Sequence, residues 1–306
     1  MNEYVKALQA ARQSISAMLL GKEKVIDLCL CAFLAGGHIL IEDLPGVGKT
    51  TLAKALARTL GLSFSRIQCT SDLLPADILG GNIWNGVAQN LVFQRGPINA
   101  QLVLADELNR ASPRTQSACL QAMEEREVTV EGQTYVLPRP FFVVATQNPS
   151  ESGGVYQLPE SQLDRFLFRL TIGLPTRDTE IDLLKRGKID SGNAGVQEVL
   201  NSEKILEMQN LVQKIEVNDR LLRYFMNVVE LLRSRFDGLS PRGSLGWLNA
   251  AKAYAFLNGR NMVTPDDVQA VALATLSHRL VRRPGETQLS KMYEIITETV
   301  QEVAVF

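Results

Sequence analysis

The sequence is poor in the residue types that most often build metal and redox centres. Its 306 residues include two histidines and four cysteines, and no pair of cysteines has the C-x-x-C spacing typical of such centres. His38 and His278 lie far apart in the chain and do not indicate a metal site or a proton shuttle. The cysteines all lie in apolar stretches: Cys29, Cys31, Cys69 and Cys119. We expect them to be core residues of a protein from a reducing compartment.

The sequence also lacks a strong net charge and a long apolar run. The formal net charge is −1, so no overall field attracts nucleic acid or acidic lipid. The most apolar region, 25–41, is interrupted by Asp27 and two glycines and is too short to cross a bilayer. The N-terminus does not resemble a secretory signal. We expect a cytoplasmic protein with no transmembrane segment and no nucleic-acid partner.

The first half of the chain alternates apolar strands with helical segments. The strands are expected at 39–42, 64–69, 102–105, 141–146 and 166–172. This alternation predicts a parallel sheet with helices on both faces. Two β-hairpins are expected to project from it. The first covers 80–93 around Asn85-Gly86, and the second covers 128–137 with its turn at Glu131-Gly132.

Beyond residue 175 the patterns are helical. Helices are expected at 178–186, 202–215, 219–236, 242–257 and 266–280. Ser240-Pro241 and Thr264-Pro265 each place a capping hydroxyl before a proline, which is typical of a helix start. The glycine-containing segment 189–196 is expected to be a loop or linker. The chain is therefore predicted to divide into an α/β domain, residues 1–175, and an all-helical domain, residues 176–306.

The stretch after the first strand predicts an anion site at the start of a helix. Its residues are Pro45, Gly46, Val47, Gly48, Lys49, Thr50 and Thr51. Backbone N–H groups of such a turn bind phosphate, and glycine lets the main chain come close to it. Lys49 can reach the outer phosphates, and the Thr50 hydroxyl can bind Mg²⁺. Asp43, however, occupies the position of the first glycine in the G-x-x-x-x-G-K-[ST] pattern.

Polar residues follow two of the predicted strands. Asp106 and Glu107 follow strand 102–105, where ligands of open parallel sheets bind. Asp106 would there hold Mg²⁺, and Glu107 would polarise an attacking water. Asn148, after strand 141–146, could hydrogen-bond that water or the γ-phosphate. Two solvated acids at a strand end, or an asparagine in a turn, are also common without any function.

Two arginines occupy positions of interest further along the chain. Arg165 precedes the last strand of the α/β domain, and Arg242 lies in the first turn of a predicted helix. Each alone is also typical of a solvated or salt-bridged surface arginine. A phosphate loop, an Asp-Glu strand end, an Asn strand end and two arginines in this order form a far more specific combination.

This combination resembles the AAA+ ATPases and, within them, the MoxR family. The resemblance extends from about residue 20 to residue 267. It is carried by ADELNRASPRTQS at 105–117, LQAMEE at 120–125, ATQNP at 145–149, GGVYQLPE at 153–160, GPI at 96–98 and SPR at 240–242. It implies an AAA+ P-loop core, whose helix-2 insert is the 78–93 hairpin, followed by a helical lid. An acid at Asp43 is common in this family.

The resemblance also implies the cofactors, ATP and Mg²⁺, and the role of each site residue. Nucleotide binding is assigned to Gly21, Pro45, Gly46, Val47, Gly48, Lys49, Thr50 and Thr51, and metal binding to Thr50 and Asp106. Glu107 matches the catalytic base, and Asn148 matches the first sensor. Arg165 matches the arginine finger that reaches the ATP of a neighbouring subunit. Arg242 matches the second sensor, which acts in cis or in trans.

The implied activity is Mg²⁺-dependent ATP hydrolysis at the subunit interfaces of a homo-oligomeric ring, usually a hexamer. Hydrolysis would rotate the lid about a hinge near 174–178 and remodel, assemble or activate a client protein. The partner in this family is often a von Willebrand factor A domain protein. Three alternatives stay open: a magnesium-chelatase-type ATPase subunit, a DNA-acting AAA+ motor, and a nucleotide-dependent binding switch without remodelling. The 105–110 and 122–125 motifs favour MoxR over the chelatase, and the neutral charge disfavours DNA.

Overall fold

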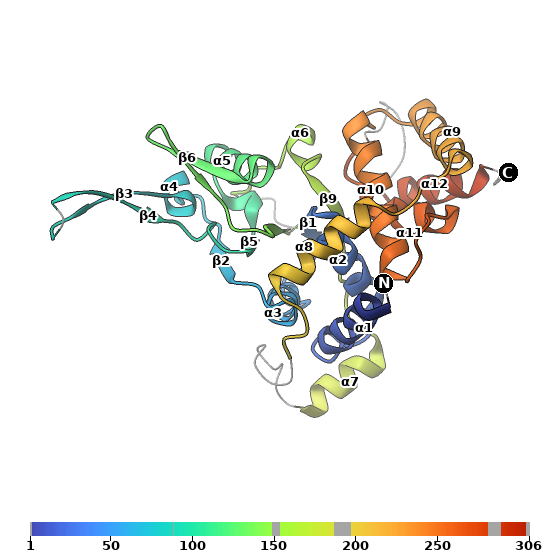
Figure 1. Ribbon diagram of the computed structural model, residues 1–306, viewed down its shortest axis with the longest axis horizontal. Helices are drawn as coiled ribbons and strands as arrows, with labels where there is room; N and C mark the ends of the chain where they lie inside the picture. The colour runs from blue at the N-terminus through green and yellow to red at the C-terminus, as the bar shows by residue number, and fades with distance from the viewer. Residues whose placement is uncertain (1, 88, 149–153, 187–196, 281–288, 304–306) are drawn as a thin grey trace.

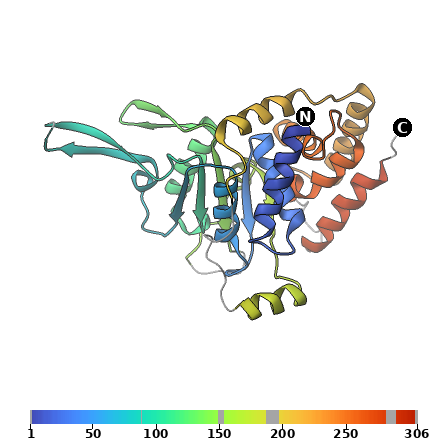
Figure 2. The ribbon, with the colours of Figure 1, turned by 60° about the horizontal axis from the view of Figure 1, so that its bottom comes forward.

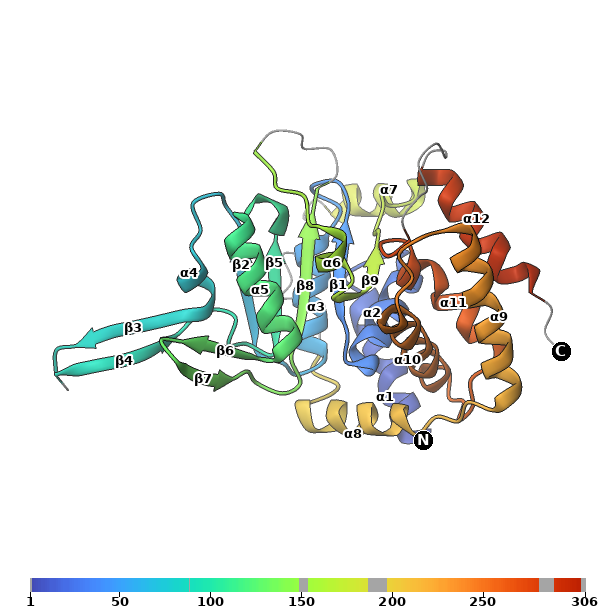
Figure 3. The same cartoon turned by 90° about the horizontal axis from the view of Figure 1, so that it is seen from above.

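A five-stranded parallel sheet forms the centre of the molecule. The computed structural model describes residues 2–87, 89–148, 154–186, 197–280 and 289–303. The strands lie in the order β2-β5-β8-β1-β9 (Figure 3), and every pairing is parallel. Their bounds are β1 (His38–Glu42), β2 (Phe64–Gln68), β5 (Leu102–Asp106), β8 (Phe142–Gln147) and β9 (Phe166–Leu170). The predicted α/β class is confirmed, and each predicted strand lies within two residues of its observed bounds.

Helices cover both faces of this sheet because its strands alternate apolar side chains between two cores. Ile39 and Ile41 of β1 belong to one core, whereas Leu40 belongs to the other. The first core also contains residues of α1 (Asn2–Ser16), α2 (Glu23–Ala35) and α3 (Lys49–Thr59). The second contains residues of α5 (Pro113–Glu125), which follows the short 3₁₀ helix η1 (Leu108–Arg110). This pattern is typical of a sheet buried on both faces.

The helices from residue 219 onward form the lid, at the end of the molecule opposite the hairpins (Figures 1 and 2). The helices that follow the sheet in the chain are α7 (Arg177–Arg186), α8 (Ser202–Gln213), α9 (Asp219–Arg235), α10 (Pro241–Leu257), α11 (Pro265–Leu276) and α12 (Leu289–Glu302). The first five were predicted, and the predicted start at Ser240 is confirmed, since its Oγ accepts a hydrogen bond from Gly243 N at 3.0 Å. The expected loop 189–196 lies outside the described residues.

The lid does not have a core of its own. Helices α8 and α10 pack on α2, and their apolar residues join the same cluster as one face of the sheet. A domain boundary at residue 175 therefore stays a prediction. Among the described residues, no helix combines the length and the apolar character needed to span a bilayer.

Two β-hairpins project from the sheet-bearing part, as predicted (Figure 1). They are β3 (Gly80–Asn85) with β4 (Asn90–Arg95), preceded by α4 (Pro75–Leu79), and β6 (Glu127–Val130) with β7 (Gln133–Val136). The rings of Phe93 and Tyr135 stack between them with centroids 3.9 Å apart. The second hairpin turns at Glu131-Gly132, and both residues have the positive φ that a type I′ turn requires.

The turn of the first hairpin is longer than its Asn85-Gly86 pair suggests. Asn85 pairs with Asn90, so the connection between the two strands is longer than two residues. The Asn85 side-chain Oδ1 accepts a hydrogen bond from Val87 N at 3.0 Å. Asn85 is therefore the last paired residue of β3 and begins an Asx turn. It is not the first residue of a two-residue turn.

One buried guanidinium joins the lid to the sheet. The Arg279 side chain is 4% exposed, and its Nε donates to Asp164 Oδ1 at 2.7 Å. Its Nη atoms donate to Leu167 O at 3.0 Å and to Phe166 O at 2.6 Å. The adjacent His278 Nε2 donates to Phe166 O at 2.9 Å. Buried charges require such complete pairing, so these contacts determine where the end of α11 sits on β9.

The four cysteines are buried core residues, as the sequence suggested, and His38 is held by hydrogen bonds inside the fold. All four cysteines are free and buried, and burial raises the pKa of Cys29 to about 12. His38 accepts at Nδ1 from Val143 N and donates from Nε2 to Met123 O, both at 3.0 Å. Burial lowers the pKa of His38 to about 4, so the folded protein holds this ring neutral.

Acidification should therefore weaken the fold through His38. An unfolded chain protonates this ring near pH 6.5, whereas the folded chain resists protonation until about pH 4. Between pH 7 and pH 5 this difference lowers the free energy of unfolding by about 2 kcal/mol. Urea denaturation at the two pH values measures it. His38→Gln should be less stable at pH 7 but lose less on acidification. Equal losses in the two proteins would contradict this role of His38.

Candidate active site

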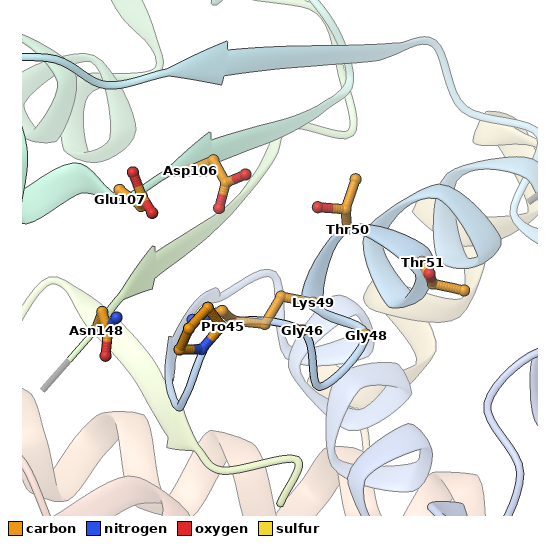
Figure 4. A pocket seen from close by; sticks show the side chains of 9 residues that line it. All are labelled: Pro45, Gly46, Gly48, Lys49, Thr50, Thr51, Asp106, Glu107 and Asn148. Carbon is orange, nitrogen blue, oxygen red and sulfur yellow. The ribbon is translucent and has the colours of Figure 1, made fainter. Parts of the chain in front are cut away.

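The phosphate loop and the ends of two strands line one polar pocket of about 280 Å³. The lining residues, shown in Figure 4, are Pro45, Gly46, Gly48, Lys49, Thr50, Thr51, Asp106, Glu107 and Asn148. Strands β1, β8 and β5 are neighbours and run in parallel, so their carboxyl ends meet at the same edge of the sheet. The structure thus brings together nine of the residues that the sequence singled out.

The loop between β1 and α3 depends on two glycines with positive φ. Gly46 has a φ of 86° and Gly48 a φ of 100°, a conformation that side chains with a Cβ rarely adopt. A Cβ on Gly48 would also lie 3.0 Å from Leu19 Cδ1. Gly48 caps α3, so the positive end of the helix dipole and its free N–H groups face the pocket. This arrangement favours phosphate.

Asp43 fastens the start of this loop to the segment before the lid. The carboxylate accepts from Leu44 N at 2.8 Å and from Gly173 N at 2.6 Å, and it is 7% exposed. Its main-chain oxygen accepts from Lys49 Nζ at 2.7 Å. The acid in place of the first glycine is therefore a structural anchor. It does not line the pocket and does not disrupt the phosphate loop.

Asp106 lies at the end of β5 in a network of fixed hydrogen bonds. Its Oδ1 accepts from Thr146 Oγ1 at 2.7 Å, and its Oδ2 accepts from Arg66 Nε at 3.1 Å and Nη2 at 2.6 Å. The same Thr146 oxygen accepts from Glu107 N at 2.9 Å. One buried hydroxyl on β8 thus holds both acidic residues. Neither Thr146 nor Arg66 was predicted as a site residue from the sequence, although Arg66 is a charged residue within a half-apolar strand.

Glu107 adopts a left-handed conformation with φ 57° and ψ 47°. Successive residues of a strand point to opposite faces, and this conformation ends that alternation so that Asp106 and Glu107 line the same pocket. Glu107 Oε2 accepts from Gln68 Nε2 at 3.1 Å and forms an ion pair with Arg110 Nε at 3.3 Å. Strain of this kind clusters at functional sites.

Three further predicted site residues, the first sensor Asn148 and the nucleotide-binding Val47 and Gly21, lie in different surroundings. Asn148, at the end of β8, is buried and lines the pocket. Val47 packs against the apolar core. Gly21 precedes α2 with a φ of 71°, and a Cβ there would lie 3.3 Å from Thr179 Oγ1 of α7. Neither Val47 nor Gly21 lines the pocket, and the nucleotide contacts of both stay predictions.

The two arginines also lie outside the pocket lining, but they meet each other at one carboxylate. Arg165 Nε is 3.1 Å from Glu124 Oε2, and Arg242 Nη1 is 2.6 Å from Glu124 Oε1. Glu124 belongs to the last turn of α5. Salt-bridged arginines were the alternative interpretation at the sequence level. The convergence of both on the same acid could not be read from the sequence.

The chemistry of the pocket fits Mg²⁺ and a nucleotide. A carboxylate on Asp106 and a hydroxyl on Thr50 are the hard oxygen ligands that Mg²⁺ prefers. In Figure 4 the Thr50 side chain and the two carboxylates face the same hollow, and Lys49 extends from the first turn of α3 across the loop. Positive charge for phosphates and oxygen ligands for a metal therefore lie within one cavity.

Comparison with known proteins agrees with this geometry. Residues 38–168 match the model of the ATPase family associated with various cellular activities (AAA), and residues 237–303 match the AAA lid domain. The uncharacterized protein YeaC of Bacillus subtilis is 45% identical over 280 residues, which cover 90% of this chain and 88% of YeaC. Chaperone MoxR1 of Mycobacterium tuberculosis is 38% identical over 289 residues, covering 90% of this chain and 76% of MoxR1.

A solved structure and a more distant relative complete the comparison. The crystal structure of a protein assigned as an ATPase, from Cytophaga hutchinsonii, superposes with a TM-score of 0.89 at 32% identity, covering 99% of this chain and 96% of that one. A magnesium-chelatase subunit ChlI homolog of Methanocaldococcus jannaschii is 29% identical over 217 residues, covering 67% of this chain and 57% of that protein. Because the AAA and AAA lid models both match and the relatives cover most of its length, the chain belongs to the MoxR family of AAA+ ATPases and is an ATP-hydrolysing enzyme.

Proposed function

We propose that the pocket binds ATP with Mg²⁺ and that each of the residues lining it has a distinct role in hydrolysis. Lys49 and the loop N–H groups hold the phosphates, and Thr50 with Asp106 holds the metal. Bound Mg²⁺ supplies positive charge to the phosphate oxygens. Glu107 accepts the proton of the attacking water, and Asn148 orients that water. The observation that carries this proposal is the convergence of the phosphate loop and both acids on one cavity.

We further propose that the site is completed by a neighbouring copy of the chain. Phosphoryl transfer relies on positive charge around the transferred group. Among the described residues that line the chain's own pocket, Lys49 is the one with a cationic side chain. Arg165 and Arg242 lie together outside this lining, where a second subunit could meet them. The enzyme would then be a homo-oligomeric ring, with six subunits as the family resemblance implies, and a lone subunit would bind ATP but hydrolyse it slowly.

The proposed role of this ATPase is chaperone-like remodelling, assembly or activation of a client protein in the cytoplasm, together with a von Willebrand factor A domain partner. The relative named Chaperone MoxR1 supports it. So does the β3–β4 hairpin, which projects from the body and exposes Ile83, Trp84 and Leu91. The chelatase relative matches at lower identity and over a shorter length than MoxR1, and no observation favours the DNA motor or the binding switch.

Binding and hydrolysis should separate in two variants of the pocket. Lys49→Ala removes the charge that meets the phosphates, so its affinity for a fluorescent ATP analogue should fall at least tenfold. Glu107→Gln keeps the phosphate loop intact and should bind the analogue as the wild type does, while turnover falls by about 10²–10⁴-fold. Tight binding by Lys49→Ala, or wild-type turnover in Glu107→Gln, would refute the respective role.

Mixing experiments test the shared site. Arg165→Ala subunits have an intact pocket but no finger to offer, whereas Glu107→Gln subunits offer a finger but cannot hydrolyse. Each alone should be nearly inactive. When mixed, the steady-state ATPase rate should exceed the sum of the two separate rates. No recovery at any ratio would mean that the arginine does not act across an interface.

The remodelling role predicts a nucleotide-dependent complex. Glu107→Gln bound to ATP should retain partner and client from the source cell in a pull-down, whereas Lys49→Ala treated in the same way should not. A von Willebrand factor A domain protein among the retained proteins, with its addition stimulating wild-type turnover, is the expected result. Equal recovery with both variants would argue against an ATP-gated chaperone.

A further inference from the structure

A single carboxylate gathers the two arginines that lie outside the pocket. Glu124 Oε2 pairs with Arg165, and Glu124 Oε1 pairs with Arg242, so each oxygen serves a different guanidinium. The three residues come from α5, from the turn before β9, and from the first turn of α10. They are 118 positions apart at the widest separation, between Glu124 and Arg242, so only the folded chain brings them together.

Without this carboxylate the two guanidiniums would separate. Like charges a few ångströms apart repel one another, and each arginine has a long, flexible side chain that would turn into solvent. A carboxylate can accept from two guanidiniums at once because its two oxygens offer about four lone-pair directions. Glu124 therefore keeps two positive charges close together and limits the directions in which they point.

The main chain on each side of this cluster is also fixed. Asp164, next to Arg165, accepts from Arg279 with its side chain at 2.7 Å and with its main-chain oxygen at 3.2 Å. The α10 helix that carries Arg242 starts at Ser240, whose Oγ caps it and donates to Asp164 Oδ2 at 3.4 Å. The contacts of Asp164 with Arg279 and Ser240 thus fix the main chain near Arg165 and Arg242. Glu124 is left to determine the direction of the two arginine side chains.

Glu124 has no part in the pocket of its own subunit. It is absent from the lining, and its side chain is 38% exposed. Its neighbour Glu125 makes a different contact. Both of its carboxylate oxygens accept from Gln121 Nε2, one helical turn earlier, at 3.1 and 3.0 Å. Partly exposed ion pairs contribute little to stability, so a role in folding does not account for this arrangement.

We propose that Glu124 is a positioning residue that holds Arg165 and Arg242 as one unit and presents them together to the ATP of the neighbouring subunit. The inference rests on the proposed shared site. Misplacing a charged group by about 1 Å is enough to lower a rate by roughly 10²-fold. Glu124→Gln keeps the shape of the side chain but removes the charge that attracts both guanidiniums.

The variant should slow catalysis without weakening binding. For Glu124→Gln we expect kcat to fall by roughly 10- to 100-fold, while affinity for a fluorescent ATP analogue, thermal stability and oligomer size stay those of the wild type. Glu125→Gln is the matched control one residue away and should retain wild-type kcat. In Arg165→Ala, adding Glu124→Gln should slow turnover much less than it does in the wild type.

Subunit mixing distinguishes a residue that serves the neighbour from one that serves its own pocket. Glu124→Gln subunits have an intact pocket and a poorly held arginine pair. They should recover activity when mixed with Glu107→Gln subunits, which offer a correctly held pair. Mixed with Arg165→Ala subunits they should not recover, because neither type supplies both arginines in place.

The outcomes separate the inference from the proposal on which it rests. Recovery of Glu124→Gln with Arg165→Ala, or a kcat equal to or above the wild type, overturns the positioning role even if Arg165→Ala and Glu107→Gln complement each other. Failure of that last pair overturns the shared site, and the positioning role with it. A loss of oligomer or of thermal stability in Glu124→Gln alone, with normal kcat per assembled subunit, also overturns it.

Discussion

The structure depends on one buried charge, the guanidinium of Arg279. A charge taken out of water is destabilising unless hydrogen bonds replace its hydration, and here Asp164 and the carbonyl oxygens of Phe166 and Leu167 do so. The burial lowers the pKa of Arg279, while Asp164 opposes that shift. These requirements leave α11 few ways to sit on β9. The position of the lid, and of the arginine next to Asp164, follows from satisfying this one side chain.

Strand β9 is also held by a buried side chain at its C-terminal end. Beyond its last residue, Gly173 N donates to the carboxylate of Asp43 at the start of the phosphate loop. Along the strand, Arg169 pairs with Glu42 of β1. A single strand of the sheet is therefore bonded to the nucleotide loop at its end and to the lid at its beginning, where Arg165 emerges. The chain's own pocket and the arginines outside it are parts of one continuous, hydrogen-bonded frame.

Local pattern was sufficient to predict the strands, the phosphate loop and the acids, because each is decided by neighbours in the sequence. Lys49 opens a helix after two glycines, and Asp106 ends an apolar run. The long-range contacts were beyond such reasoning. Asp43 departs from the usual phosphate-loop pattern, and only the structure shows that its carboxylate has a partner 130 positions away. Thr146 was read as part of a strand, and its hydroxyl proved to hold both acids. Glu124 belonged to a recognised motif, yet nothing local showed which side chains it meets.

The same contacts bear on how far the lid can move within one subunit. A hinge near 174–178 was expected from the sequence, but helices α10 and α11 touch the chain on the other side of that hinge. Rotating them would break the hydrogen bonds of Arg279 and separate α10 from α2. The apolar surface exposed by that separation would destabilise the rotated state by about 25 cal/mol for each Å². An unpaired buried charge adds several kcal/mol to that penalty. Free rotation about 174–178 is therefore opposed by contacts far from the hinge. A smaller movement of the lid would carry Arg165 with it, because Arg279 of the lid binds the residues on both sides of Arg165, Asp164 and Phe166.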